Sequence, residues 1–148
     1  MPVILLVSAS ERRRAIMADF SEKDGIEVRF SVLKEPEPEP LTNLEVHLQV
    51  ESSCMHKARS AVLELGYGEN SDVEMIVVSD TLVEDPDDSR VALGKPEDKV
   101  SAASTLIRLS GRRHKVWSST AIVTRNGTGL EVGGGGGGRV GNECQIGG

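Results

Sequence analysis

A short polar segment follows the first buried apolar run of the chain, and its residue types suit phosphate binding. Ser8-Ala9-Ser10 comes directly after Val3–Val7 and precedes Arg12, Arg13 and Arg14. Small residues let a phosphate approach the free backbone N–H groups of a helix start, and arginines add bidentate donors. The alternative interpretation of the three arginines is an exposed basic turn that binds no ligand. The small residues in front of the triplet favour the anion site.

A carboxylate, Asp80, takes a comparable place after the apolar run at residues 73–78. Open α/β sheets bind ligands beyond the carboxyl ends of their strands. An Asp at that place can hold a divalent metal or orient a water molecule for attack on phosphorus. It can equally cap a turn through its own side chain, and its position alone does not separate the two interpretations.

Two lysines and an acidic loop complete the candidates. Lys95 stands in a Gly-Lys-Pro sequence just before an expected helix, whereas Lys57 lies within a helix, where an exposed lysine is the alternative. Glu35, Glu37 and Glu39 alternate with prolines, and a charge run of this kind is by default a surface loop.

Other polar groups of the sequence lack the spacing of known sites. His56 and His114 do not have metal-ligand spacing, so satisfied structural roles are expected for both. The acids at 85–88 lack the Gly and the terminal Glu of an EF-hand loop and indicate a hairpin tip. The glycine run at 133–138 lacks the Lys-Ser/Thr pair of a P-loop.

The elements that must position these residues alternate between strands and helices, which predicts an α/β domain with a mixed sheet and flanking helices. Ser10 is expected to cap the first helix. Strands are expected at residues 3–7, 27–32, 73–78 and 116–124, helices at 11–20, 44–65 and 97–109, and hairpins around 85–88 and 126–127. The apolar stripes of the second and third helices are Cys54, Met55, Ala58, Ala61, Val62 and Leu65, and Val100, Ala103, Leu106 and Ile107.

The charge, the cysteine content and the lengths of the apolar runs disfavour several classes of protein. The 148 residues carry 17 Lys and Arg against 23 Asp and Glu, a formal charge of -6, which disfavours nucleic-acid binding. Two cysteines without metal or disulfide spacing fit a reducing compartment. No run reaches the length of a membrane span or fits a signal peptide, so we expect a cytoplasmic protein without a membrane partner. The sequence does not decide between a monomer and a homodimer.

Taken in order, these segments resemble the Maf family of nucleoside triphosphate pyrophosphatases over roughly residues 3–125. The resemblance rests on five motifs with plausible gaps, each weak alone and specific together. They are Ser8-Ala9-Ser10-x-Arg12-Arg13, Lys57-Ala58, Ser79-Asp80-Thr81, Gly94-Lys95-Pro96 and Leu109-Ser110-Gly111-x-x-His114-x-Val116.

The resemblance implies an inosine triphosphatase-like fold with two lobes around a cleft. It also implies hydrolysis of a nucleoside triphosphate to the monophosphate and pyrophosphate, dependent on a divalent metal such as Mg²⁺ or Mn²⁺. Carried over by motif, Ser8, Ser10, Arg12 and Arg13 would grip the triphosphate, and Lys57 and Lys95 would neutralise phosphate charge. Asp80 would bind metal or activate water, with Glu37, or alternatively Glu39, as the second carboxylate. The Arg12-Arg13 and Asp80-Thr81 pairs resemble the branch acting on dTTP and UTP.

Two features depart from the family pattern. Glu11 replaces the usual proline after Ser10, which adds a negative charge near the expected phosphate site. After Val132 comes a glycine-rich tail in which only Gln145 could replace a family glutamine, so we expect a domain at 1–132, incomplete at its C-terminus, and a disordered tail at 133–148. The alternatives to an enzyme are therefore a catalytically inactive nucleotide-binding remnant and a chain too short to fold stably.

Overall fold

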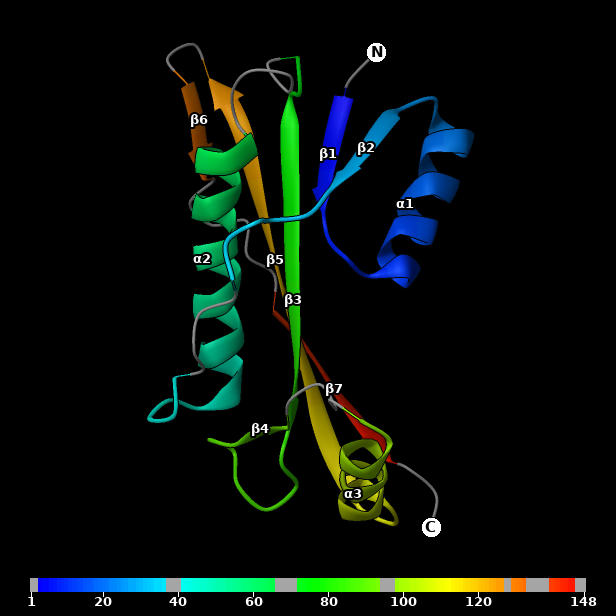
Figure 1. Cartoon of the computed structure of the whole chain (residues 1–148), viewed down its shortest axis with the longest axis vertical. Helices are drawn as coiled ribbons and strands as arrows, with labels where there is room; N and C mark the ends of the chain where they lie inside the picture. The colour runs from blue at the N-terminus through cyan, green and yellow to red at the C-terminus, as the bar shows by residue number, and fades with distance from the viewer. Residues whose placement is uncertain are drawn as a thin grey trace. The chain divides into compact units, whose positions relative to one another are not determined.

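A computed structural model describes residues 3–36, 41–65, 72–93, 98–126, 129–132 and 139–145, with the backbone alone after residue 124. Figure 1 shows the order of the helices and strands along the chain. The chain divides into two compact units. The first unit comprises Met1–Pro38, Ser53–Ser79 and Thr120–Gly138, and the second comprises Glu39–Ser52, Asp80–Ser119 and Arg139–Gly148.

The first unit is built on a mixed sheet. β1 (Val3–Val7) is parallel to β2 (Glu27–Ser31) and to the beginning of β3 (Met75–Glu84). The end of β5 (Arg113–Asn126) pairs with β6 (Gly129–Val132) as an antiparallel hairpin, and the strand order is β2-β1-β3-β5-β6. The predicted class, a mixed α/β sheet with flanking helices, is confirmed. A cleft between two lobes stays a prediction.

The first helix of this unit, α1 (Glu11–Asp24), begins where the sequence predicts and ends later. The Ser10 side chain accepts a hydrogen bond from the backbone N–H of Arg13, which satisfies one of the free donors at the helix start. Gly25 ends the helix at φ 67°, a left-handed conformation that glycine adopts without a steric penalty. The helix therefore runs four residues beyond the predicted end at Phe20.

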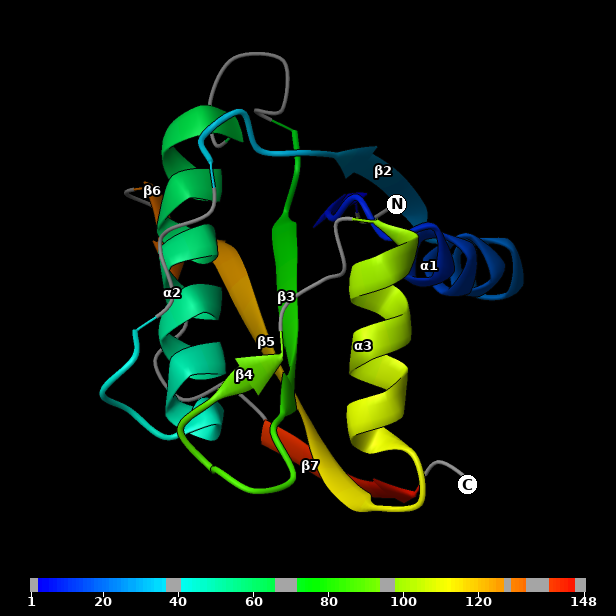
Figure 2. The same ribbon diagram turned by 60° about the horizontal axis from the view of Figure 1, so that its bottom comes forward.

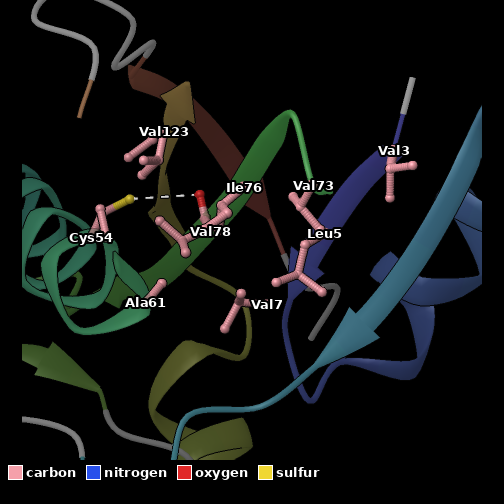
Figure 3. Packing of buried hydrophobic residues seen from close by; sticks show 11 residues of the cluster. Val3, Leu5, Val7, Cys54, Ala61, Val73, Ile76, Val78 and Val123 are labelled. Carbon is pink, nitrogen blue, oxygen red and sulfur yellow. Dashed lines mark hydrogen bonds between the residues drawn. The ribbon is translucent and has the colours of Figure 1, made fainter. Parts of the chain in front are cut away.

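The core of the first unit lies between the strands and α2 (Val46–Leu65), whose C-terminal part belongs to this unit. Cys54, Ala58 and Ala61 are fully buried, and the Cys54 thiol approaches the carbonyl oxygen of Val78 at 3.8 Å (Figure 3). The predicted stripe of α2 is confirmed except at Met55, which is exposed. The buried cluster is Val3, Leu5, Val7, Cys54, Ala58, Ala61, Val73, Ile76, Val78, Ala121 and Val123. These aliphatic contacts fix the end of β1, which Ser8 follows.

The second unit contains the predicted hairpin and the third helix. The end of β3 pairs with β4 (Ala92–Leu93) in antiparallel fashion, so the acids at 85–88 lie in the connecting turn as predicted. α3 (Lys99–Leu109) begins after Asp98, whose carboxylate accepts from the backbone N–H of Ser101 at 2.7 Å. Among the described residues, no helix combines the length and the apolar character that crossing a membrane requires.

The apolar stripe predicted for α3 is not buried. Val100 and Ile107 are 75% and 76% exposed, and Leu106 and Ala103 are exposed as well. Leu109 is the buried residue of this helix. Figure 2 shows α3 along its length. Helical spacing shows which residues share a face, but not whether another element covers that face.

The structure also differs from the sequence prediction near the C-terminus. Arg139–Gln145 form β7, antiparallel to the first part of β5, with Arg113 opposite Gln145 and Ser119 opposite Arg139. The sequence predicted no regular structure there because the segment lacks apolar periodicity. Strand pairing depends on backbone hydrogen bonds and needs no such periodicity when a partner strand is already in place. Residues 133–138 lie outside the described part of the chain.

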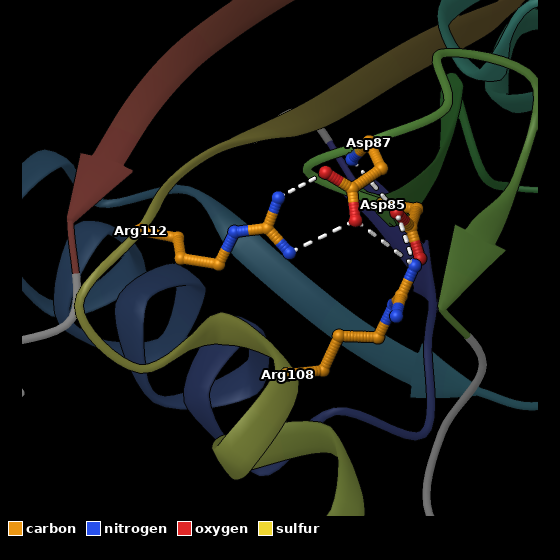
Figure 4. A network of polar contacts seen from close by, with 4 residues as sticks. All are labelled: Asp85, Asp87, Arg108 and Arg112. Atoms are coloured by element: carbon orange, nitrogen blue, oxygen red, sulfur yellow. Dashed lines mark hydrogen bonds and ion pairs between the residues drawn. The ribbon is translucent and has the colours of Figure 1, made fainter.

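A network of two acids and two arginines joins the hairpin turn of the second unit to the end of α3 (Figure 4). Asp85, with its side chain 4% exposed, accepts a hydrogen bond from Arg108 Nη2 at 3.0 Å and a second from Arg108 Nε. Asp87 accepts from Arg112 Nη1 at 2.9 Å, and its other oxygen also contacts Arg112. The backbone N–H of Asp87 donates to Asp85 at 2.8 Å. The turn is thereby fixed to α3 by charge-assisted hydrogen bonds.

Replacing Asp85 with asparagine is expected to lower the free energy of unfolding by about 1–2 kcal/mol, because the guanidinium of Arg108 loses its carboxylate partner. The hydrogen bonds from Arg108 lower the pKa of the Asp85 carboxyl below its ordinary value. Since the pKa is lower in the folded state, this contribution is present above the unfolded pKa of about 3.9 and is lost as the pH falls below it. Urea unfolding at neutral and acidic pH measures both effects. Asp24→Asn, at an exposed carboxylate, is the control, and an equal loss in both variants would contradict the assignment.

Candidate active site

The turn between β1 and α1 is the place where the sequence predicts an anion site. Ser8 is buried at the end of β1, and its backbone N–H donates to the carbonyl oxygen of Ser31 at 3.0 Å. The Ser8 hydroxyl accepts from the backbone N–H of Ser10 at 3.1 Å, and Ser10 in turn caps α1. Two of the predicted phosphate-binding residues are thus linked directly, and the dipole of α1 favours an anion at this turn.

The three arginines that follow the turn have different surroundings. Arg14 Nε donates to the carbonyl oxygen of Ser8 at 2.8 Å, and its guanidinium lies 5.7 Å from the ring centre of Phe30. Arg13 Nη1 donates to the carbonyl oxygen of Ser79 at 3.4 Å, whereas Arg12 is exposed. Arg14 therefore stabilises the turn through this hydrogen bond. The sequence alone did not distinguish this role from phosphate binding. Arg12 and Arg13 remain the predicted phosphate-binding arginines.

A pocket of about 140 Å³ opens beside this turn within the first unit. Ser8 and Lys57, both predicted site residues, line it together, so the structure brings the β1 turn and the middle of α2 to one place. The full lining is Val7, Ser8, Ala9, Val32, Leu33, Glu35, Pro36, His56, Lys57 and Ser60. A lysine next to a helix start with polar small residues can bind and neutralise a phosphate group.

Three polar residues of this pocket were not predicted as site residues. Ser60 Oγ donates to Glu35 Oε2 at 2.8 Å, and His56 Nε2 lies 3.8 Å from Glu35 Oε1. The spacing of three residues between Lys57 and Ser60 places both on one helix face, and this was the signal available in the sequence. The sequence did not show which of the three alternating glutamates, Glu35, Glu37 or Glu39, contacts this helix face.

Asp80 and Thr81 belong to the second unit and lie in the middle of β3. Asp80 is partly buried, and its Oδ1 accepts from the backbone N–H of Thr81 at 3.0 Å. The Thr81 and Ser118 hydroxyls are 2.9 Å apart, which joins β3 to β5. β3 extends to Glu84, beyond the predicted end at residue 78, so these two residues are part of the strand and do not follow it.

Glu37 and Lys95 fall at positions 37–40 and 94–97, outside the described residues, as does Glu39. Their proposed contributions, a second carboxylate and a second phosphate-binding lysine, stay predictions. His114 is buried on β5, and its Nδ1 has no hydrogen-bond partner in the described part of the chain. The satisfied structural role expected for His114 is therefore wrong at this atom.

The described residues hold no group of three His, Cys, Asp or Glu side chains that could bind a metal ion alone. Mg²⁺ does not require such a group, because it commonly takes one or two protein carboxylates together with substrate phosphates and water. Glu35, which lines the pocket of the first unit, supplies hard carboxylate oxygens of this kind. The donor chemistry therefore fits a divalent cation that arrives with a phosphorylated ligand.

Comparison with known proteins identifies the family. The family model described as Maf-like protein matches residues 3–135 of the chain. The chain belongs to the Maf family. The dTTP/UTP pyrophosphatase of Akkermansia muciniphila is 36% identical over 122 residues, covering 82% of this chain and 57% of the relative. That of Nitratidesulfovibrio vulgaris is 32% identical over 124 residues, covering 84% of this chain and 53% of the relative.

The match to these Maf relatives thus spans a little over half of their length. Among solved structures, a HAM1 protein from Coxiella burnetii resembles the chain with a TM-score of 0.57 at 16% identity, covering 99% of this chain and 73% of that one. This likeness supports the fold that the resemblance implied. The recognition of the Maf family from five short motifs is confirmed.

Proposed function

We propose that this Maf family chain hydrolyses a nucleoside triphosphate to the monophosphate and pyrophosphate, with a preference for dTTP and UTP. One observation carries the proposal: Ser8 of the β1–α1 turn and Lys57 of α2 line a single pocket beside the start of α1. The relatives named dTTP/UTP pyrophosphatase support the substrate class and the choice of bases.

The reaction breaks one phosphorus–oxygen bond of the triphosphate chain and forms one to the oxygen of water. The oxygen of a water molecule bonds to the α-phosphorus, the bond from that phosphorus to the oxygen that bridges the α- and β-phosphates breaks, and its electron pair leaves with pyrophosphate. The water gives up a proton to a base or to solvent. Catalysis of this kind depends mainly on positioning the phosphates and on stabilising their charge.

Each candidate residue has a part in this scheme. The backbone N–H groups and hydroxyls of the turn at Ser8 and Ser10 would hold phosphate oxygens, while Arg12, Arg13, Lys57 and Lys95 would neutralise their charge. Asp80 would hold a cation or orient the attacking water, with Glu37 as the second carboxylate of the family pattern. A bound divalent cation would supply additional charge neutralisation at the phosphates.

Pyrophosphate release from a panel of nucleoside triphosphates, with Mg²⁺ or Mn²⁺, tests the proposal. We expect turnover of dTTP and UTP above that of the purine nucleotides. In Asp80→Asn, which keeps the size of the side chain and removes its charge, the rate should fall by about a hundredfold or more. Nucleotide-dependent thermal stabilisation without turnover would instead identify a nucleotide-binding protein. No turnover and no stabilisation of a folded protein would contradict both functions.

A further inference from the structure

The backbone N–H groups of the turn between β1 and α1 differ in whether the protein already supplies their acceptors. Some donate to oxygens of the first unit, namely those of Ser8, Ser10 and Arg13. Others have no acceptor among the described residues, namely those of Ala9, Glu11 and Arg12. Of the latter residues, Ala9 lines the pocket together with Lys57. The backbone N–H of Ala9 is therefore a donor at the pocket that a ligand can use.

The peptide group that joins Ser8 to Ala9 is held on its carbonyl side by Arg14. Arg14 Nε donates to the carbonyl oxygen of Ser8 at 2.8 Å. The described part of the chain has no cis peptide bond, and in a planar trans peptide the C=O and N–H bonds point in opposite directions. A donor that fixes the direction of the Ser8 carbonyl therefore also fixes the direction of the Ala9 N–H.

The Arg14 side chain is itself held between α1 and β2. Its guanidinium lies 5.7 Å from the ring centre of Phe30, within the range of a cation–π contact. Phe30 stands opposite Leu6 on the neighbouring strand β1, close to the point where β1 leads into the turn. The backbone N–H of Arg14 donates to the carbonyl oxygen of Ser10 at 3.1 Å. Arg14 thus connects the first turn of α1 and β2 to the Ser8 peptide.

An N–H group whose direction is fixed before binding is an effective phosphate donor. Such a group loses little conformational entropy when the ligand arrives, so more of the hydrogen-bond energy contributes to affinity. Ala9 is exposed, and its side chain ends at Cβ, which leaves the backbone accessible to a phosphate oxygen. Lys57 lines the same pocket and supplies the positive charge that a backbone N–H lacks.

We propose that Arg14 is a positioning residue for the phosphate-binding turn: through the Ser8 carbonyl, it directs the Ala9 N–H toward a phosphate oxygen of the bound nucleotide. This inference rests on the proposed function of the pocket. It separates Arg14, which acts through the backbone, from Arg12 and Arg13, which would contact the phosphates with their side chains.

NMR spectra of the ¹⁵N-labelled full chain, titrated with the α,β-methylene analogue of dTTP and Mg²⁺, follow the Ala9 amide directly. The analogue resists the proposed reaction, because carbon replaces the bridging oxygen at the bond that breaks. In the wild type, the Ala9 amide proton should shift downfield at saturation, since a hydrogen bond to a charged oxygen forms. In Arg14→Met, most of this shift should be lost, and the dissociation constant of the analogue should rise about tenfold.

Milder variants and a control complete the series. Arg14→Lys keeps the charge but places its ammonium one bond beyond the position of Nε, so it should recover only part of the affinity. Phe30→Leu, at a residue 39% exposed, should raise the dissociation constant about two- to threefold, because the guanidinium loses its ring contact. Arg29→Met removes the hydrogen bonds of 2.6 and 2.8 Å to Asp72 in the same unit, and should leave both the dissociation constant and the Ala9 shift at their wild-type values.

The outcomes separate this inference from the proposed function. An unchanged dissociation constant and Ala9 shift in Arg14→Met, in a chain whose wild type binds the analogue and hydrolyses dTTP, would overturn the inference and leave the function intact. A raised dissociation constant with an unchanged Ala9 shift would also overturn it, because Arg14 would then bind phosphate through its own side chain. No binding of the analogue and no hydrolysis of dTTP by the folded wild type would overturn both.

Discussion

Replacing Lys57 with methionine is expected to lower kcat/KM for dTTP by about 10²- to 10³-fold, because the pocket loses the cation that it places beside the β1–α1 turn. Methionine keeps most of the length and apolar volume of the lysine stem, so packing along α2 changes little. Steady-state pyrophosphate release, with thermal unfolding measured in parallel, separates the loss of charge from a loss of stability.

The matched control is Lys23→Met, at a lysine whose side chain is 72% exposed at the end of α1 and pairs with Asp19. This variant should retain the wild-type kcat/KM, since surface ion pairs of this kind contribute little. Lys57→Arg should recover part of the activity, because the charge returns while the geometry of its donors differs. Equal activity in Lys57→Met and Lys23→Met would exclude the pocket as the phosphate site.

Replacing Ile76 with alanine is expected to lower the free energy of unfolding by about 2–5 kcal/mol. Ile76 is 1% exposed on β3 and belongs to the buried cluster between the sheet and α2. Truncation removes buried apolar area and leaves a cavity that neighbouring strands cannot fill completely. Ile16→Ala, at a position 62% exposed on α1, makes the same chemical change and should shift the unfolding midpoint little. Similar losses in the two variants in urea titrations would contradict the core described above.

The positions of most elements followed from local chemistry that the sequence displays. Ser10 marked the start of α1 because its side chain caps the helix, and the apolar spacing of α2 identified the face that packs on the sheet. The sequence predicts the end of α1 at Phe20, because the apolar residues stop there. The backbone hydrogen bonds of the helix continue to Gly25, whose N–H donates to the carbonyl oxygen of Ser21 at 3.1 Å. Backbone pairing without an apolar signal also explains why β7 was not expected.

Some residues of the candidate site were predictable because a short motif carries them. Ser8 and Lys57 come from segments far apart in sequence, and the structure places both in the lining of one pocket; their part in binding phosphate stays a prediction. Glu35 was missed because the alternation of Glu and Pro does not reveal which acid meets α2. Its contacts with Ser60 and Glu64 depend on the register between the loop and the helix, which is a tertiary feature. For α3, the sequence showed a shared apolar face, but its exposure could be seen only in the fold.

The central step of the proposed function is the attack of water on the α-phosphorus of a nucleoside triphosphate bound at this pocket. Turnover of dTTP in ¹⁸O-labelled water, with the products analysed by mass spectrometry and ³¹P NMR, tests it directly. We expect one ¹⁸O atom in dTMP and unlabelled pyrophosphate, with labelled dTMP formed about a hundredfold or more slowly by the Asp80→Asn variant. Label in pyrophosphate or in orthophosphate, or the absence of any turnover by the folded wild-type chain, would contradict the claim.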